Sequence, residues 1–446
     1  MKNDQTASVT QLTLSLNYSG DEPVIGNQNH SNFILAPSFM MQVLERNNLI
    51  RALKQVQRNK GAAGVDGMTT DSLSDYLKAH WEDIKKTLLE ETYRPAAVMR
   101  VEIPKSDGSK RKLGIPTVLD RFIQQAIAQV LNVHWDKDFH ENSYGFRPKR
   151  SAHQAIKYAK HIIQSGHSWV VDLDLKSFFD EVNHDRLMKR LAMRIEDDVV
   201  LRLINRYLKA GVQINGKKEK SRKGVPQGGP LSPILSNIVL DELDRELQGR
   251  GHKFARYADD CNIFVKSKAS GERVKKSITH FIERTLRLKV NEHKSAVDRP
   301  YKRTFLGFTF SRRGNKIKVA DKALLKLKGT VRQLTRRTRG LKLTQIIADL
   351  KKPLLGWKAY FDIAEVMSPL RNLDKWIRRK LRCYIWKQWG RAGYRNLRRL
   401  GIDVKLAWNT SKSAHGPWRL SGSPALYYAL PNKYFVNLGL PLLVAR

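Results

Sequence analysis

The chain has 446 residues, of which 41% are hydrophobic, and this content suits several packed domains and excludes wholesale disorder. Its 82 Lys and Arg residues against 42 Asp and Glu residues give a formal net charge of +40, which predicts a polyanionic partner and favours nucleic acid over a membrane. Two cysteines exclude a disulfide framework and a paired-cysteine zinc site, while the lack of a long apolar run or a signal-peptide pattern predicts a cytoplasmic protein without a membrane span.

The N-terminal region begins with a polar stretch that shows no sustained periodicity. Residues 1–37 are rich in Asn, Gln, Ser and Thr, so we expect a flexible extension. The segment Gly61–Gly67 predicts a loop between helices, where the glycines serve either close approach to a ligand or a simple turn. Apolar residues at helical spacing from Leu73 to Leu88 then predict a helix after a Thr70/Asp71 start signal.

A basic hairpin and another helix follow. The runs Val98–Pro104 and Arg111–Ile115 predict two strands around a polar turn, to which Lys105 and Arg111 give a positive charge. The next periodic apolar run predicts a helix capped by Asp120. The hairpin is therefore a candidate contact for phosphate groups.

The middle of the chain places acidic residues at the end of a buried strand. Trp169–Leu175 is the apolar run that predicts this strand, and its alternation puts Asp172 and Asp174 on one face. Residues 185–209 predict one helix rich in Leu and Val. Residues 231–247 predict another helix, which follows a Gly/Pro turn.

Two further carboxylates lie in the segment Tyr257–Asp260, between the β-favouring runs Phe254–Tyr257 and Cys261–Val265. This pattern predicts a hairpin with adjacent acids, Asp259 and Asp260, at its tip. Mg²⁺ is usually held by one or two carboxylates together with substrate phosphates, so such a tip suits a divalent metal. The alternative is an ordinary turn, because Asp favours turns through local hydrogen bonds.

Carboxylates from two separate segments suit nucleotidyl transfer. That chemistry needs acids from different parts of the chain to hold two ions about 3.5–4 Å apart. Asp174 and Asp259 are the candidates for this convergence, with Asp260 as a supporting ligand. Asp174 alone also suits a helix N-cap ahead of Lys176–Val182, but a cap does not account for the hairpin acids.

The last third of the chain carries most of the positive charge. Residues 301–446 hold 33 Lys and Arg residues and 6 Asp and Glu residues, a net of +27. Apolar stripes that begin at Leu324 and Ile346 predict helices, the second despite Pro353. Six tryptophans are interleaved with these cations, a composition that suits phosphate contacts and base stacking.

Several ordered motifs carry a resemblance to a known family. Four segments resemble successive reverse-transcriptase motifs in order and spacing: Asp174–Asp180, Gly224–Pro233, Arg256–Asp260 and Phe305–Phe308. Four others resemble, more narrowly, the bacterial group II intron reverse transcriptases: Tyr144–Pro148, Ser236-Asn237, Leu355–Phe361 and Trp376–Arg379. From about residue 40 to 446 the chain is similar to their compact class C type, which lacks a C-terminal endonuclease.

The resemblance implies a catalytic centre at the acids already identified. Asp174, Asp259 and Asp260, with the Leu175 carbonyl, would hold two Mg²⁺ ions, for which Mn²⁺ is a substitute. Lys294 matches the lysine that protonates the leaving pyrophosphate, and the alternative is a solvated surface lysine.

The resemblance also implies a nucleotide pocket. Phe179 matches the steric gate that excludes a 2′-OH, and the alternative is a core phenylalanine. Gln227 would lie over the incoming nucleotide and template base. Lys105 and Arg111 would clamp the triphosphate, a role that suits their charge. Phe305–Phe308 resembles the primer grip.

The fold implied is α+β, a right-hand polymerase with fingers and a palm built on an antiparallel sheet, followed by an α-helical thumb and a basic C-terminal DNA-binding segment. Along the chain the expected parts are a flexible extension (1–37), fingers with an N-terminal template loop (38–150), a palm with the remaining fingers elements (151–315), a thumb with maturase character (316–390) and the DNA-binding segment (391–446).

The function implied is an RNA-directed DNA polymerase of the bacterial cytoplasm. It would copy an RNA template with dNTPs from a DNA primer, and bind group II intron RNA to assist splicing and mobility. One alternative is a maturase that acts only as an RNA-binding cofactor, which the intact acids disfavour. Another is a reverse transcriptase without an intron, used in host defence or DNA repair. None of these patterns sets the oligomeric state.

Overall fold

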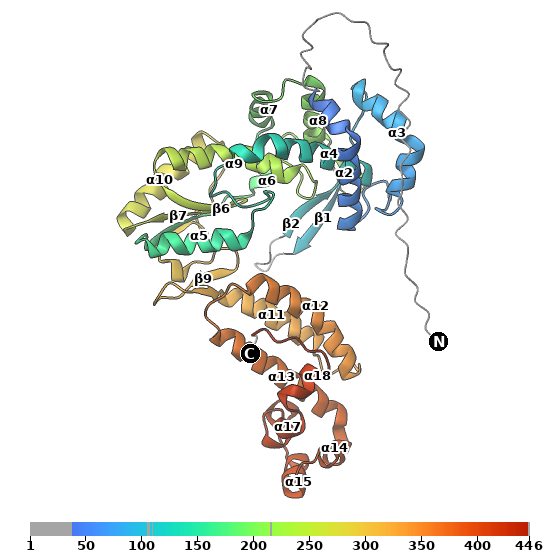
Figure 1. The fold of residues 1–446 in the computed structure, drawn as a ribbon, viewed down its shortest axis with the longest axis vertical. Coiled ribbons are helices and arrows are strands. Elements are labelled where there is room, and N and C mark those ends of the chain that lie inside the picture. Colours follow the sequence, from blue (N-terminus) through green and yellow to red (C-terminus); the bar gives the residue numbers. More distant parts are fainter. Residues whose placement is uncertain (1–37, 105–107, 109, 215, 445–446) are drawn as a thin grey trace, which may run out of the picture.

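The computed structural model describes residues 38–444 except 105–107, 109 and 215. A mixed part of helices and sheets and a helical part lie one after the other along the longest axis of the molecule (Figure 1). These mixed elements and antiparallel strand pairs confirm the predicted α+β class. The predicted extension at 1–37 and the candidate Lys105 lie outside the described residues.

The N-terminal part combines helices with a small sheet. Its elements are α1 (Phe39–Leu44), α2 (Arg46–Asn59), α3 (Leu73–Leu89), β1 (Val98–Pro104), β2 (Lys110–Ile115) and α4 (Val118–Trp135). The predicted basic hairpin is confirmed, because β1 and β2 pair antiparallel with Ile103 opposite Arg111. The short strands β4 (Val212–Ile214) and β5 (Lys217–Glu219) complete the order β2-β1-β4-β5.

The helix predicted from Leu73 to Leu88 is confirmed as α3, although its cap position is Ser72 rather than the Thr70/Asp71 start signal. α4 is capped by Thr117, whose hydroxyl oxygen accepts a hydrogen bond from the Asp120 amide at 3.1 Å. The prediction that Asp120 is the cap was wrong, because its carboxylate is buried and accepts a hydrogen bond from the Tyr93 hydroxyl at 2.8 Å.

A second sheet, with strand order β6-β7-β3-β8, forms the centre of the mixed part. Its elements are β3 (Trp169–Leu173), β6 (Lys253–Tyr257), β7 (Asp260–Val265) and β8 (Ala296–Asp298). All of its neighbouring strands are antiparallel. The predicted hairpin over Phe254–Val265 is therefore confirmed, and the strand expected at Trp169–Leu175 ends at Leu173.

Alternation divides the side chains of this sheet between two hydrophobic clusters. Val170 and Phe264 pack with α5 (Ala152–Gln164), whereas Val171 and Ile263 pack with α10 (Lys268–Arg284) and α9 (Ser232–Gly249). Figure 1 shows α5 and α10 beside the strands. Because β3 alternates, Asp172 belongs to the same face as Val170.

The helix predicted at 185–209 is two helices. α7 (His184–Ala192) and α8 (Asp198–Lys209) are separated at Asp197, whose carboxylate accepts hydrogen bonds from the Val199 and Val200 amides at 3.0 and 3.3 Å. This N-cap starts a new helix, so a continuous apolar content did not mean a continuous helix.

The helical part begins after the short hairpin of β9 (Phe308–Phe310) and β10 (Ile317–Val319). Its elements are α11 (Asp321–Leu334), α12 (Leu343–Phe361), α13 (Ser368–Trp389), α14 (Gly393–Arg399), α15 (Val404–Lys412), α16 (Pro417–Leu420), α17 (Pro424–Ala429) and α18 (Asn432–Asn437). α12 continues through Pro353, and both predicted stripes contribute to the cluster that these helices share. Among the described helices, none is long and apolar enough to cross a membrane.

Both cysteines of the chain are buried free thiols. Cys261 in β7 is 3% exposed and Cys383 in α13 is 4% exposed. Burial raises the pKa of both thiols above its ordinary value, so neither is activated as a thiolate.

Candidate active site

The predicted acids converge at one edge of the central sheet. β3 pairs with β7, and Leu173 lies opposite Cys261, so the residues that follow β3 lie beside the tip of the β6–β7 hairpin. Asp174 directly follows β3, where its amide donates to the Ser295 hydroxyl at 3.0 Å and its carbonyl accepts from the Asn291 amide at 2.8 Å. Asp174 does not cap a helix, because α6 (Phe178–Glu181) begins after Ser177.

The hairpin tip has a constrained backbone. Tyr257 pairs with Asp260, which leaves Ala258 and Asp259 as the turn residues. Ala258 has a φ of 57°, a left-handed conformation that costs a non-glycine residue on the order of 1–3 kcal/mol. Gly145 passes so close that a Cβ built on it would lie 2.2 Å from the Ala258 nitrogen. The turn is therefore held against its own preference by neighbouring structure.

The acids form one electrostatic unit. Solvent reaches the Asp260 side chain, yet partial desolvation and then the charges of Asp259, Asp172 and Asp174 raise its pKa to about 7. Desolvation is also the largest effect on Asp259, whose pKa is raised further by Asp174 and lowered by Arg111. Mutual repulsion of this kind makes the cluster suitable for cations.

The acid cluster fits a divalent metal that shares its coordination with a substrate. Within the described residues, no three His, Cys, Asp or Glu side chains are arranged to hold a metal ion by themselves. Mg²⁺ does not need such a cage, because it usually binds through one or two carboxylates plus substrate phosphates and water. The oxygen-only donor set of Asp174, Asp259 and Asp260 suits this hard cation.

Lys294 and Leu175 lie beside the acids. The charge of Lys294 lowers the pKa of Asp260, which places the ammonium group near the cluster. Leu175 is 6% exposed and bridges to Val290. Leu175 thus lies where β3 leaves the sheet, and Lys294 lies just before β8, which pairs with β3.

An arginine that the sequence did not indicate connects these groups. Arg303 donates two hydrogen bonds to the Asp172 carboxylate, at 2.9 and 2.6 Å, and one to the Lys294 carbonyl at 2.6 Å. It neutralises the fourth acid of the cluster and fixes the backbone that carries Lys294. Arg303 follows Asp172 by 131 positions, so no local pattern could have found the contact.

The predicted nucleotide-pocket residues lie around a glycine-rich loop. Phe179 in α6 is half-buried, packs against the core, and accepts a hydrogen bond at its carbonyl from the Val225 amide at 2.6 Å. Gln227 accepts a hydrogen bond at its carbonyl from the Gly114 amide of β2 at 2.8 Å. Gly228, at a φ of 126°, allows this approach, because a Cβ there would lie 2.6 Å from the Gly114 carbonyl oxygen.

The loop therefore joins the basic hairpin to α6. Arg111 lies on β2 three residues before Gly114, and its charge acts on Asp259. The structure thus links Arg111 to the acids through its charge, and links Phe179 and Gln227 to the same loop through their carbonyls. Phe179 contacts the core, as expected if it is a core phenylalanine rather than a steric gate. Its side chain is only partly buried, however.

A second group missed from the sequence lies beneath the hairpin tip. The Arg256 side chain is completely buried and donates hydrogen bonds to Asp244, Asn237, Ser143 and the Ala258 carbonyl. Burial opposes its charge, but the Asp244 carboxylate more than compensates and keeps the pKa of Arg256 above its ordinary value. The motif letters were visible in the sequence, but their mutual contacts were not.

The helical part contacts the site through α12. The Tyr360 hydroxyl donates to the Leu306 carbonyl at 2.9 Å, and the rings of Phe361 and Phe308 lie 4.9 Å apart. Desolvation raises the pKa of Tyr360, and the neighbouring Tyr257 and Asp260 raise it further. The predicted primer-grip turn is thus held from the side of α12.

Further along, exposed aromatic rings alternate with cations. Arg379 lies 4.4 Å from the Trp418 ring centroid, and Lys412 lies 4.8 Å from that of Trp408. Trp408 and Trp418 remain 52% and 40% exposed, a surface that suits stacked bases and phosphates.

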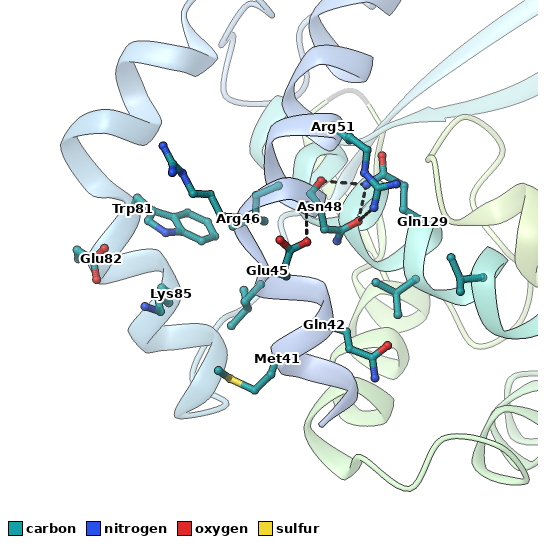
Figure 2. A pocket seen from close by; sticks show the side chains of 14 residues that line it. Met41, Gln42, Glu45, Arg46, Asn48, Arg51, Trp81, Glu82, Lys85 and Gln129 are labelled. Carbon is teal, nitrogen blue, oxygen red and sulfur yellow. Dashed lines mark hydrogen bonds between the residues drawn. The ribbon is translucent and has the colours of Figure 1, made fainter. Parts of the chain in front are cut away.

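An apolar pocket lies elsewhere, among α1, α2, α3 and α4. Figure 2 shows Met41, Asn48, Trp81 and Gln129 around it. None of the predicted site residues lines this pocket, so it is separate from the acid cluster.

Two family models match this chain. Residues 103–310 match the family model described as "Reverse transcriptase (RNA-dependent DNA polymerase)", and residues 324–401 match "Group II intron, maturase-specific domain". The first match contains all the described candidate site residues, and the second covers α12 and α13.

Two curated relatives share substantial sequence identity. Protein YkfC of Escherichia coli is 35% identical over 289 residues, which cover 56% of this chain and 76% of that protein. Group II intron-encoded protein LtrA of Lactococcus lactis is 37% identical over 206 residues, 46% of this chain and 34% of that protein. The match with LtrA thus spans about a third of that relative's length.

Among solved structures, a telomerase from Candida albicans in complex with a fragment of telomeric RNA is 15% identical. It has a TM-score of 0.42 and covers 72% of this chain and 63% of that chain. The family models and the relative YkfC are the matches that identify the chain. It belongs to the group II intron reverse transcriptase/maturase family, whose polymerase domain is an RNA-directed DNA polymerase.

Proposed function

We propose that this chain copies RNA into DNA at the edge of its central sheet, with Asp174, Asp259 and Asp260 as the catalytic acids. The observation that supports this most directly is the convergence of Asp174 with the hairpin acids, which share one electrostatic field with Arg111 and Lys294. Divalent cations held by these acids and the Leu175 carbonyl, two Mg²⁺ ions in our proposal, would lower the energy of charge that develops during phosphoryl transfer.

The remaining candidate residues orient the reactants. Arg111 binds the triphosphate of a dNTP, Phe179 lies under the sugar and Gln227 lies over the base. Lys294 delivers a proton to the pyrophosphate leaving group, and Arg303 holds its backbone in place. The charge of Arg111 lowers the pKa of Asp259, which supports this division because it implies a cation within electrostatic reach of the acids.

The parts of the chain then take the roles expected of a right hand. We assign fingers to 38–150, palm to 151–315, thumb to 316–390 and a DNA-binding segment to 391–446. The exposed Trp408 and Trp418 with their cations support nucleic-acid binding by the last segment. The partners are an RNA template, group II intron RNA, a DNA primer or target, and dNTPs, in the bacterial cytoplasm.

Primer extension on an RNA template tests the proposed centre. Asp259→Ala removes one carboxylate of the cluster and should abolish dNTP incorporation, while RNA affinity and the melting temperature stay close to wild type. Asp83→Ala, an exposed change on α3, is the control and should leave incorporation unchanged. Retained polymerisation by the Asp259 variant would exclude it as a catalytic acid.

A further inference from the structure

The clearest unexplained feature of the palm is a buried guanidinium with a complete set of partners. Arg256 Nε and Nη2 donate to the Asp244 carboxylate at 2.7 and 2.5 Å. Nη1 donates to Asn237 Oδ1 at 3.1 Å, and Nη2 also donates to the Ser143 hydroxyl at 2.7 Å. A guanidinium has five N–H donors, and the fifth bond is the one that matters most here.

That fifth bond reaches the catalytic turn. Arg256 Nη1 donates to the Ala258 carbonyl at 2.9 Å, and this carbonyl belongs to the peptide that joins Ala258 to Asp259. The bond therefore fixes the peptide plane immediately before the Asp259 side chain. Because Ala258 has a left-handed φ, that plane would not keep its orientation through local preference alone.

The partners of Arg256 form a rigid support. Ser143, Asn237, Asp244 and Arg256 are each 0% exposed, and Asn237 also donates to the Gly145 carbonyl at 2.8 Å. The loop that carries Ser143 is tied to β6, because the Tyr144 amide donates to the Arg256 carbonyl and the Arg256 amide donates to the Asn142 carbonyl, both at 2.9 Å. The support thus joins this loop and α9 to the hairpin.

Contact from the same loop holds the other side of Ala258. A Cβ at Gly145 would lie 2.2 Å from the Ala258 nitrogen and 2.9 Å from the Tyr257 carbonyl carbon. The peptides before and after Ala258 are therefore each held by a group from this support.

We infer that Arg256 is a positioning residue, which orients the Asp259 carboxylate through the Ala258 carbonyl and so sets the metal affinity of the acid cluster. This inference rests on the proposed function. It goes beyond the role of the acids, because it assigns their geometry to a buried side chain that touches neither substrate nor metal.

The test combines a strong and a mild variant. Arg256→Lys keeps the charge but cannot make five bonds, and Ser143→Ala removes a single bond to the guanidinium. We measure kcat per active molecule, the half-saturating Mg²⁺ concentration and the affinity for an RNA–primer duplex. In Arg256→Lys, kcat should fall on the order of 100-fold, because a misplacement of about 1 Å has that effect, and half-saturation should need more Mg²⁺.

Ser143→Ala should shift kcat and the Mg²⁺ requirement in the same direction by a smaller factor, with duplex affinity unchanged in both variants. The matched control is Tyr93→Phe, which also removes one hydroxyl hydrogen bond to a buried group, Asp120 in α4. It should leave the Mg²⁺ requirement at the wild-type value. A merely structural role would lower the melting temperature and the active fraction but not the Mg²⁺ requirement of active molecules.

The inference is overturned if Arg256→Lys keeps the wild-type kcat and Mg²⁺ requirement, or if Tyr93→Phe shifts that requirement equally. Should Arg256→Lys not fold, Ser143→Ala decides by the same criterion. Failure of the proposed function gives a different result, because the wild-type protein would then incorporate no dNTP at all.

Discussion

Asp260 is the residue at which repulsion among the acids of the cluster has a large effect on a pKa. Its pKa of about 7 compares with an ordinary value of 3.8, and the causes are partial desolvation followed by the charges of Asp259, Asp172 and Asp174. A bound cation would reduce this repulsion. Asp260 therefore destabilises the folded protein without metal and favours metal binding for the same reason.

This shift makes the stability of the metal-free protein dependent on pH. The folded state holds the Asp260 proton up to about pH 7 while the unfolded state releases it near pH 4, so this contribution to the free energy of unfolding falls as pH rises through that window. Asp260→Asn should therefore stabilise the protein in EDTA more at pH 8 than at pH 5. Chemical unfolding at both pH values measures the difference.

The control for this prediction is Asp83→Asn, an exposed change far along the chain on α3. Its effect on stability should be similar at both pH values. If Asp260→Asn also changed the free energy of unfolding equally at pH 5 and pH 8, the cluster would carry no such repulsion. Added Mg²⁺ should raise the free energy of unfolding of the wild-type protein by more than it raises that of the Asp260→Asn variant.

Single residues also mark what the sequence could predict. Asp174, Asp259 and Asp260 were found because adjacent letters and strand alternation carry the signal. Arg303 and Asp172, or Arg256 and Ser143, meet across more than a hundred positions. Such long-range hydrogen bonds leave no local pattern, so their roles needed the three-dimensional arrangement.

At the scale of elements, α12 connects the helical part to the Phe305–Phe308 turn at the start of β9. Phe361 is 7% exposed and packs on Phe308, and Gly307 at a φ of 80° lies near the Phe361 ring. The stripe on α12 was predicted from its period, whereas its docking on the Phe305–Phe308 turn was not. Periodicity shows which face is buried but not what covers it.

Phe361→Ala should loosen this junction. Removal of a buried ring costs about 3–5 kcal/mol, so we expect a lower free energy of unfolding and fewer nucleotides added per binding event. Leu355→Ala on the same helix is the control, because Leu355 is 45% exposed and should change neither quantity. Denaturant titration and primer extension with a trap are the measurements. Equal effects of the two variants would contradict a specific junction.

Element boundaries show the same limit in another form. The apolar content at 185–209 predicted one helix, but Asp197 caps a second helix with its carboxylate. The cap was present in the sequence as the middle residue of Glu196-Asp197-Asp198, an acidic group between two apolar segments. Its effect depended on the backbone turn at 193–197, which composition does not report.

At the scale of the whole molecule, charge is distributed unevenly along the chain. The net of +27 over residues 301–446 lies mainly on the helical part, beyond the acid cluster. Composition alone predicted that this region binds a polyanion. The structure adds the pairing of Arg379 with Trp418 and Lys412 with Trp408.

Binding to RNA should therefore depend steeply on salt. A protein with about 6–10 phosphate contacts loses on the order of 10³–10⁵ in affinity between 50 and 200 mM salt, because counterions are released. We expect a loss in this range for the whole chain, measured by fluorescence anisotropy. Arg379→Gln should reduce the salt slope, whereas Lys78→Gln, on α3 and paired with Asp75, should not. An RNA affinity that did not change with salt concentration would contradict a basic surface that binds a polyanion.

The two buried cysteines have a practical consequence for watching this enzyme at work. Because Cys261 and Cys383 are buried, thiol-reactive dyes should react little with them in the folded protein. The two native cysteines therefore need not be replaced before dyes are attached elsewhere. Cysteines introduced at the exposed positions Asp83 on α3 and Asn409 on α15 would carry a donor and an acceptor. Single-molecule energy transfer between them would then report how the two ends of the molecule move while a strand is being copied.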